Sequence, residues 1–408
     1  MKERRAFIVP SFLAVLLAFI LYALMNLAQP GLTALAEQTK VGFTLGDQLA
    51  GATAGSVFWN FIYSFTDFGE GAFFTDTLGT LFMFAFALLS LYLENSKSKF
   101  AGTGVAGIGN KWYWLIGCQA LGIFLANLFW RFVVGWAGWF PSFTPLVSVA
   151  PIAILCFGKP NLKKLLTGSI LGAILPVYVC QMLMTYFSGP LNLPAFAAIG
   201  AGMAVSTLIG TEIFKLLPWM TKNDPTPMEE TPVMAEEAPV ATEETPAAPA
   251  PQKTAANLVF ERVFGGDISE LYFWGSNWSG LGLFLGVAIA FLLNPLAGNG
   301  GAGNVPEMMF IMIFTSAVGM VIWGPRYQKA GYAFTFESVL VMGALVGTFP
   351  SFGLILPTAV VIAIIGPAII HWSLTTKFFQ RYAACVPVQF FASVLVIACC
   401  YILRALGA

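Results

Sequence analysis

The stretch AFIVPSFLAVLLAFILYALMNLA, residues 6–28, contains no charged residue and follows the basic N-terminal sequence MKERR. An α-helix rises about 1.5 Å per residue, so this run can cross the roughly 30 Å of hydrocarbon in a bilayer. It lacks a cleavage site of small residues after a short apolar core, which distinguishes it from a secretory signal peptide. We therefore predict that it is a transmembrane helix.

The composition of the whole chain agrees with this interpretation. Hydrophobic residues make up 58% of the 408 residues and charged residues only 10%, whereas soluble domains carry about 25% charged residues. The formal net charge is zero, and no dense basic patch with interleaved aromatic residues is present, so nucleic acid is not expected as a partner. The six cysteines lie in apolar runs without zinc or haem spacing, so no metal or cofactor is predicted.

Further apolar runs of similar length follow the first one. In lipid, the backbone groups of such runs must bond within the protein, so the runs are expected to be helices. We predict an all-α polytopic membrane protein with about 10–11 transmembrane helices, at residues 6–28, 72–93, 112–136, 140–158, 165–187, 194–219, 271–293, 307–324, 331–349, 353–373 and 382–403. The aromatic stretch 50–66 is left open, because it could span, re-enter or lie in the interface.

The distribution of basic residues tests the order of these helices. Loops on the cytoplasmic side of a membrane protein are enriched in Lys and Arg. When the chain is threaded from a cytoplasmic N-terminus, all of its 20 basic residues except Lys40, Arg131 and Arg404 fall on the cytoplasmic side. We predict a multi-pass protein of the cytoplasmic membrane with its C-terminus outside.

One long hydrophilic segment, residues 221–256, is rich in Pro, Ala, Thr and Glu and has no aromatic residue. Such a segment cannot bury enough apolar surface to fold, so we predict a disordered cytoplasmic linker between membrane halves at residues 1–220 and 257–408. The linker could be a simple tether or a docking site for a cytoplasmic partner. Whether copies of the chain associate with one another is left open. Residues 148–164 and 314–329 each read as an apolar helix ending in Gly and a Pro-containing basic turn, which suggests a parallel internal repeat.

A charged residue inside a membrane segment costs about 2.5–3.5 kcal/mol on insertion scales, so each one is a candidate functional residue. Asp67, Glu70 and Asp76 cluster with glycines that can break a helix, and Arg131 is expected at a similar depth. We predict that these four residues form an outer gate. The alternative is an ordinary interfacial cluster in which Asp76 caps the following helix.

Glu337 lies in the apolar segment YAFTFESVLVMGALVG beside Thr335 and Ser338. A buried carboxyl group without a fixed cation can exchange a proton or bind Na⁺, so we predict a coupling or substrate-binding role for these residues. Prolines inside predicted helices interrupt backbone hydrogen bonds and can expose carbonyl groups to a solute. This places Gln181 near Pro176, and Thr358 next to Pro357, in the predicted site walls.

The sequence contains no nucleotide-binding motif and no catalytic constellation of His or Cys residues. The number of helices, the two halves and the few intramembrane carboxyl groups favour a secondary transporter that moves a small solute with H⁺ or Na⁺. An intramembrane lipid-modifying enzyme is the first alternative, and it would need its acids at one leaflet. A channel, or a subunit of a larger membrane complex, is the second alternative.

Overall fold

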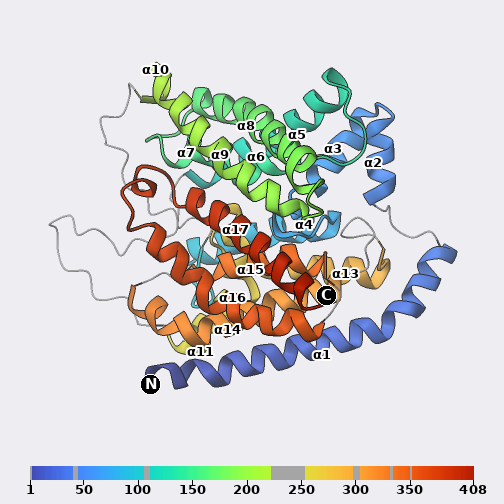
Figure 1. The fold of residues 1–408 in the computed structure, drawn as a ribbon, viewed down its shortest axis with the longest axis vertical. Helices are drawn as coiled ribbons and strands as arrows, with labels where there is room; N and C mark the ends of the chain where they lie inside the picture. Colours follow the sequence, from blue (N-terminus) through green and yellow to red (C-terminus); the bar gives the residue numbers. More distant parts are fainter. Residues whose placement is uncertain are drawn as a thin grey trace.

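The computed structural model describes residues 2–39, 45–104, 111–221, 253–296, 304–330, 334–349 and 352–408. Within these ranges every regular element is a helix, as predicted (Figure 1). The single helices that are long and apolar enough to cross a membrane number eight among the described residues. They are α1 (Lys2–Thr39), α4 (Thr77–Asn95), α5 (Trp112–Leu128, continued by a π-helical turn, η3, Phe129–Val133), α8 (Leu162–Leu183), α9 (Ala195–Leu216), α14 (Val305–Ala330), α16 (Phe352–Ser373) and α17 (Cys385–Ala405).

The remaining elements are shorter. The stretch Ala255–Tyr272 and α13 (Asn277–Leu293) are bent by 100° relative to each other, and they make a ninth, broken span if the two are counted together. That stretch consists of α11 (Ala255–Glu261), η5 (Arg262–Gly266), α12 (Asp267–Ser269) and η6 (Glu270–Tyr272). The others are α2 (Leu45–Thr53), α3 (Val57–Thr66), η1 (Gly69–Ala72), α6 (Thr144–Val147), α7 (Val149–Leu155), η4 (Met184–Ser188), α10 (Pro218–Thr221), α15 (Thr335–Val346) and η8 (Phe379–Arg381).

The predicted segments and the helices agree closely, with three differences. Two of the predicted spans, 140–158 and 331–349, contain only the short helices α6–α7 and α15; α15 has 12 residues, about 18 Å, which is too short to cross the hydrocarbon. The stretch 50–66 forms two separate helices, α2 and α3. The segment before 271, predicted as linker and loop, is the first part of the broken span.

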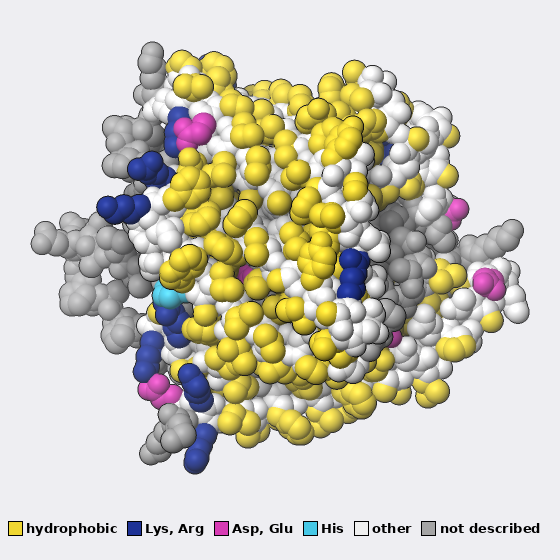
Figure 2. Space-filling model, viewed as in Figure 1, with side chains coloured by type: hydrophobic (Ala, Val, Ile, Leu, Met, Phe, Trp, Pro, Cys, Tyr) yellow, Lys and Arg dark blue, Asp and Glu magenta, His cyan; other side chains and the backbone are white. Residues whose placement is uncertain are grey.

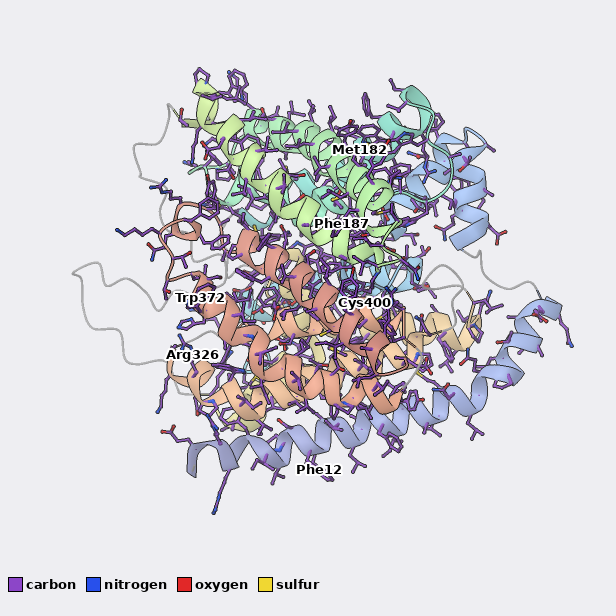
Figure 3. All side chains as sticks on the ribbon, viewed as in Figure 1. Phe12, Met182, Phe187, Arg326, Trp372 and Cys400 are labelled. Carbon is purple, nitrogen blue, oxygen red and sulfur yellow. The ribbon has the colours of Figure 1, made fainter. Side chains whose placement is uncertain are left out.

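Side chains on the surface separate by type as they do in a membrane protein. Figure 2 shows an apolar face, with Lys and Arg collected mainly along one edge of the molecule. Contacts place the basic ends of several helices at this edge: Lys329 of α14 pairs with Glu3 of α1 at 2.9 Å, and Arg326 lies 2.7 Å from His371 at the end of α16. Phe12 of α1 is 63% exposed and points away from the other helices (Figure 3).

Two helix pairs pack antiparallel and join the first half of the chain (residues 45–221) to the second half (residues 253–408). In the α4/α13 pair, the hydroxyl groups of Ser276 and Ser90 lie 3.1 Å apart, and Gly286 faces Gly79 at the other end. The α9/α17 pair is tied by Ser393, whose hydroxyl group donates to the carbonyl of Ala197. The small residues allow close approach of the helices.

The two stretches predicted to form an internal repeat, residues 148–164 and 314–329, have different secondary structures. Residues 148–164 contain the turn between α7 and α8, whereas residues 325–329 continue α14 to Ala330 without a turn. The second Pro-containing basic turn was therefore predicted wrongly.

The predicted linker, 221–256, lies largely outside the described residues, and its role as a docking segment stays a prediction.

Candidate functional site

Two breaks in the helices, one in each half, have the same sequence of polar and aromatic positions. The first break (residues 67–76) joins α3 to α4, and the second break (residues 267–276) joins η5 to α13. Each contains a one-turn 3₁₀ helix. The matching residues are Asp67 and Asp267, Glu70 and Glu270, Phe73 and Phe273, Phe74 and Trp274, and Asp76 and Ser276.

The backbone follows the same path through both breaks. Phe73 and Phe273 have positive φ angles of 65° and 64°, in the left-handed region that residues other than glycine seldom adopt. Three residues later, Asp76 accepts a hydrogen bond from the backbone N–H of Gly79 at 2.6 Å, and Ser276 caps α13 in the same way. Strain of this kind is retained at functional positions more often than elsewhere.

The two breaks touch each other in the interior of the protein. The hydroxyl group of Tyr272 donates to the carbonyl of Gly69 at 3.3 Å. Gln119 of α5 is fully buried; its amide donates to the carbonyls of Leu146 and Tyr272, and its carbonyl accepts from the indole of Trp274 at 3.0 Å. Because every polar atom of Gln119 is satisfied, this side chain fixes the second break against α6.

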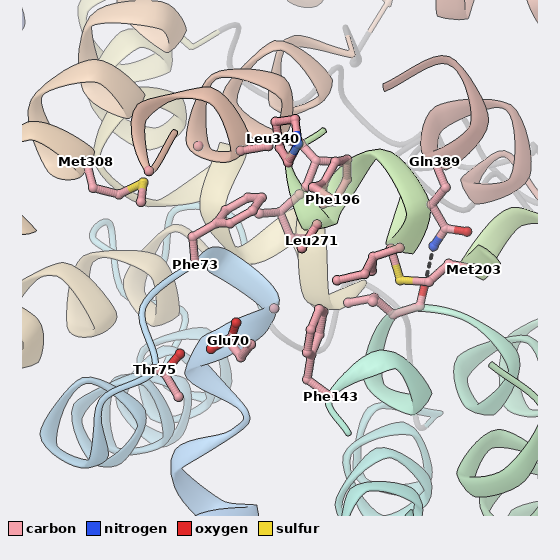
Figure 4. A pocket seen from close by; sticks show the side chains of 18 of the residues that line it. Glu70, Phe73, Thr75, Phe143, Phe196, Met203, Leu271, Met308, Leu340 and Gln389 are labelled. Carbon is pink, nitrogen blue, oxygen red and sulfur yellow. Dashed lines mark hydrogen bonds between the residues drawn. The ribbon is translucent and has the colours of Figure 1, made fainter. Parts of the chain in front are cut away.

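A cavity of about 450 Å³ lies beside the breaks and is lined by residues of both halves (Figure 4). Its walls are mostly apolar and aromatic, and its polar lining includes Glu70, Glu270 and Gln389. The lining also contains Asn304 and Thr348, which lie at the ends of α14 and α15, and Asn304 is at the end of α14 opposite the basic Lys329. A cavity of this size with a few polar groups is typical of a small-molecule site.

Glu270 is held in a buried ion-pair network. Arg262, 2% exposed, donates to both carboxylate oxygens of Glu270 and also to Asp267. Asp267 further accepts hydrogen bonds from Ser316 at 2.5 Å and from Thr335 at 2.8 Å. Arg262 is one of the basic residues predicted to lie on the cytoplasmic side; it belongs to the π-helical turn η5 and is buried inside the protein.

Glu70 has no such cation. Among the described residues no Lys, Arg or His lies within ion-pairing distance of its carboxylate, and the nearby charge is another carboxyl group, Asp67. Asp67 is fully buried, and neither of its oxygens has a hydrogen bond in the described structure, although Ser142 and Asn127 face it. Two carboxyl groups without a paired cation can both ionise only at considerable electrostatic cost.

Arg131 lies near Asp67 but does not pair directly with any of the predicted gate acids. Its guanidinium group donates to the carbonyl of Gly138 at 2.9 Å and lies over the rings of Tyr63 and Phe140, 4.9 Å and 4.7 Å from their centroids. Of the four predicted gate residues, Glu70 alone lines the cavity. Asp76 caps α4, as the alternative interpretation expected.

Glu337 lies beside the cavity wall without lining it. Phe336 and Leu340 of α15 face the cavity, whereas Glu337 is fully buried against Gly366 of α16, and neither of its oxygens has a hydrogen bond in the described structure. Ser338, on the same side, donates to the carbonyl of Ile362 at 3.0 Å.

The other predicted wall residues lie apart from these groups. Thr335 belongs to the Arg262 network through its hydrogen bond to Asp267. Gln181 is half-buried on α8, and Thr358 donates to the carbonyl of Leu354 within α16; neither is among the lining residues.

Sequence reasoning missed Glu270, Arg262 and Gln389. Glu270 could have been found, because the spacing of Asp, Glu and Phe in residues 67–73 recurs in residues 267–273. Gln389 gave no signal in the sequence, since it is a single amide in an apolar segment.

Comparisons of the chain with protein-family models, with curated proteins and with solved structures found no match.

Proposed function

We propose that this chain is a secondary transporter of the cytoplasmic membrane that moves a small solute by alternating access, coupled to H⁺ or Na⁺. The observation that carries the proposal is the cavity of about 450 Å³, lined by both halves beside two helix breaks. Carriers commonly bind solutes between their halves at interrupted helices. A site that both halves share can be opened to either side by moving one half against the other.

The direction of the helices supports such a movement. We place the basic edge and the N-terminus in the cytoplasm, following the enrichment of Lys and Arg there. With α1 crossing outward, the first half begins outside and ends inside, whereas the second half begins inside. The antiparallel packing of α4 on α13 and of α9 on α17 fits two halves of inverted orientation. We propose this inverted relation in place of the parallel repeat predicted from the sequence.

We assign Glu337 as the proton-coupling residue, because its carboxyl group is fully buried and has no cation or hydrogen-bond donor in the described structure. Glu337→Gln keeps the shape of the side chain and removes its titration. We expect this variant to transport the solute down its own gradient while losing the accompanying proton flux. The measurement uses proteoliposomes containing a pH-sensitive dye, with a panel of amines, amino acids, carboxylates and sugars.

Glu212→Gln is the control for this experiment, since Glu212 lies on the surface and pairs with Lys215 at 2.8 Å. It should retain full proton flux. If Glu337→Gln couples protons as well as the wild type does, Glu337 has no role in the mechanism.

Alternating access itself is tested with single cysteines in a background without the six native ones. Leu340→Cys places a thiol in the cavity wall, and Val339→Cys places one on a neighbouring residue that is fully buried and does not line the cavity. We expect an impermeant methanethiosulfonate to label Leu340→Cys in both right-side-out and inverted vesicles and to leave Val339→Cys unlabelled. Labelling of Leu340→Cys from one side only would favour an enzyme, and steady current in a planar bilayer would favour a channel.

A further inference from the structure

The polar lining of the cavity includes Glu70, Glu270, Gln389, Asn304 and two threonines, Thr75 and Thr348, and its carboxyl groups are those of Glu70 and Glu270. Glu270 is bound through both oxygens to Arg262, whereas the carboxylate of Glu70 has no ion pair among the described residues. Figure 4 shows Glu70 and Gln389 on different sides of the cavity. The ligand therefore meets a carboxyl group without a paired cation on the side of the first break.

Gln389 also lines the cavity, and the orientation of its amide is fixed. Its amide nitrogen donates to the carbonyl of Val147, which only the NH₂ group can do, so the side-chain oxygen is the remaining atom. This oxygen is itself buried and has no donor in the described structure. Gln389 therefore contributes side-chain surface to the cavity and no acceptor that a ligand can reach.

The wall between these two residues is aromatic. It includes Phe73, Phe143, Phe196, Phe273, Phe336 and Trp139. The faces of aromatic rings carry partial negative charge and attract cations, most strongly when water is excluded. The same rings offer apolar surface to a hydrocarbon body.

The charged groups around the cavity also favour a cationic ligand. The two breaks contribute four carboxyl groups, Asp67, Glu70, Asp267 and Glu270, and the guanidinium groups close to them are Arg131 and Arg262. The carboxyl groups outnumber the guanidinium groups by two, so their surroundings favour an added cation over an added anion. An anionic ligand would add a further negative charge beside Glu70 and is disfavoured.

We propose that the cavity binds an organic ammonium ion with an apolar or aromatic body. The ammonium group lies against the carboxyl group of Glu70, whose ionised form it would stabilise, and the body packs between the phenylalanine rings. An inorganic ion such as Na⁺ fits less well, because hard cations need several oxygen ligands whereas this lining is mainly apolar. The assignment rests on the proposed function only in taking this ligand to be the transported solute.

The test is calorimetric binding to the purified full-length chain in lipid nanodiscs at neutral pH. The probes are 2-phenylethylammonium, the neutral 2-phenylethanol, the anionic 3-phenylpropionate and NaCl. We expect the ammonium probe to bind at least ten-fold more tightly than the alcohol, and the anion not to bind. Equal affinity for the ammonium and the alcohol, preference for the anion, or binding of Na⁺ without the ammonium probe would each overturn the proposal.

Substitutions of Glu70 test where the ammonium group of the ligand binds. Glu70→Gln should weaken binding of the ammonium probe at least ten-fold and leave the affinity for 2-phenylethanol unchanged, and Glu70→Asp should recover part of the loss. Glu212→Gln, far along α9 on the surface, should bind as the wild type does. An unaltered ammonium affinity in Glu70→Gln, with the protein folded by its thermal transition, would contradict the assignment of Glu70.

The proposed binding site and the proposed transport function can be contradicted independently. Binding of the ammonium probe without uptake into proteoliposomes would contradict the transporter and leave the site intact. Uptake of another class of solute, with no binding of the ammonium probe, would support the transporter and remove this assignment.

Discussion

Arg262→Met is expected to destabilise the protein by about 3–5 kcal/mol, the usual cost of removing one partner from a buried ion pair. The guanidinium group is almost completely buried and bonds to Asp267 and Glu270. Without it, two carboxyl groups at the second break lose the buried guanidinium group that pairs with both of them. The free energy of unfolding can be measured by SDS titration in mixed micelles.

A second variant separates the loss of the charge from the loss of packing. Arg262→Met combined with Asp267→Asn and Glu270→Gln removes the whole ionic network, so no unpaired charge stays buried. We expect this triple variant to be more stable than Arg262→Met alone. Lys329→Ala breaks the exposed pair with Glu3 and should change the stability little. A wild-type transition in Arg262→Met would show that the network does not hold the second break.

Gly286→Ala should destabilise the contact between the membrane helices α4 and α13. A Cβ atom on Gly286 would lie 2.8 Å from the Cα atom of Gly79 and would also meet the carbonyl of Leu78, so α4 and α13 would have to separate. Backbone atoms cannot rotate out of the way as a side chain can. We expect a loss of about 1–3 kcal/mol, measured by the same titration.

The matched control is Gly353→Ala near the start of α16, where no heavy atom lies within 4 Å of the added Cβ. There, alanine should be tolerated, since it favours the helix without meeting a neighbour. Because α4 and α13 each begin at a break, Gly286→Ala should also weaken ligand binding in the cavity. Equal stability of the two alanine variants would show that the α4/α13 contact is not tight.

The pattern of residues that recurs at the two breaks could have been predicted from the sequence. The site that forms around the breaks could be predicted only in part. Asp67 and Glu70 stood out in the sequence as charges in an apolar setting, and the structure places Glu70 at the cavity. Arg131 was expected to form the gate with these acids; it instead packs between the rings of Tyr63 and Phe140 and donates to the carbonyl of Gly138, and these partners come from α3 and from the segment after η3. Glu337 was correctly expected to be buried, but the sequence could not tell which face of α15 meets the cavity.

The sequence by itself determined the helices and their membrane setting. Both follow from local properties: apolar runs long enough to satisfy their backbone within lipid, separated by basic ends. The tertiary structure alone decided that residues 200 positions apart, such as Glu70 and Glu270, share one cavity, and that Arg262 neutralises charge at one break only. Such contacts depend on how whole helices pack, which no local pattern of residues specifies.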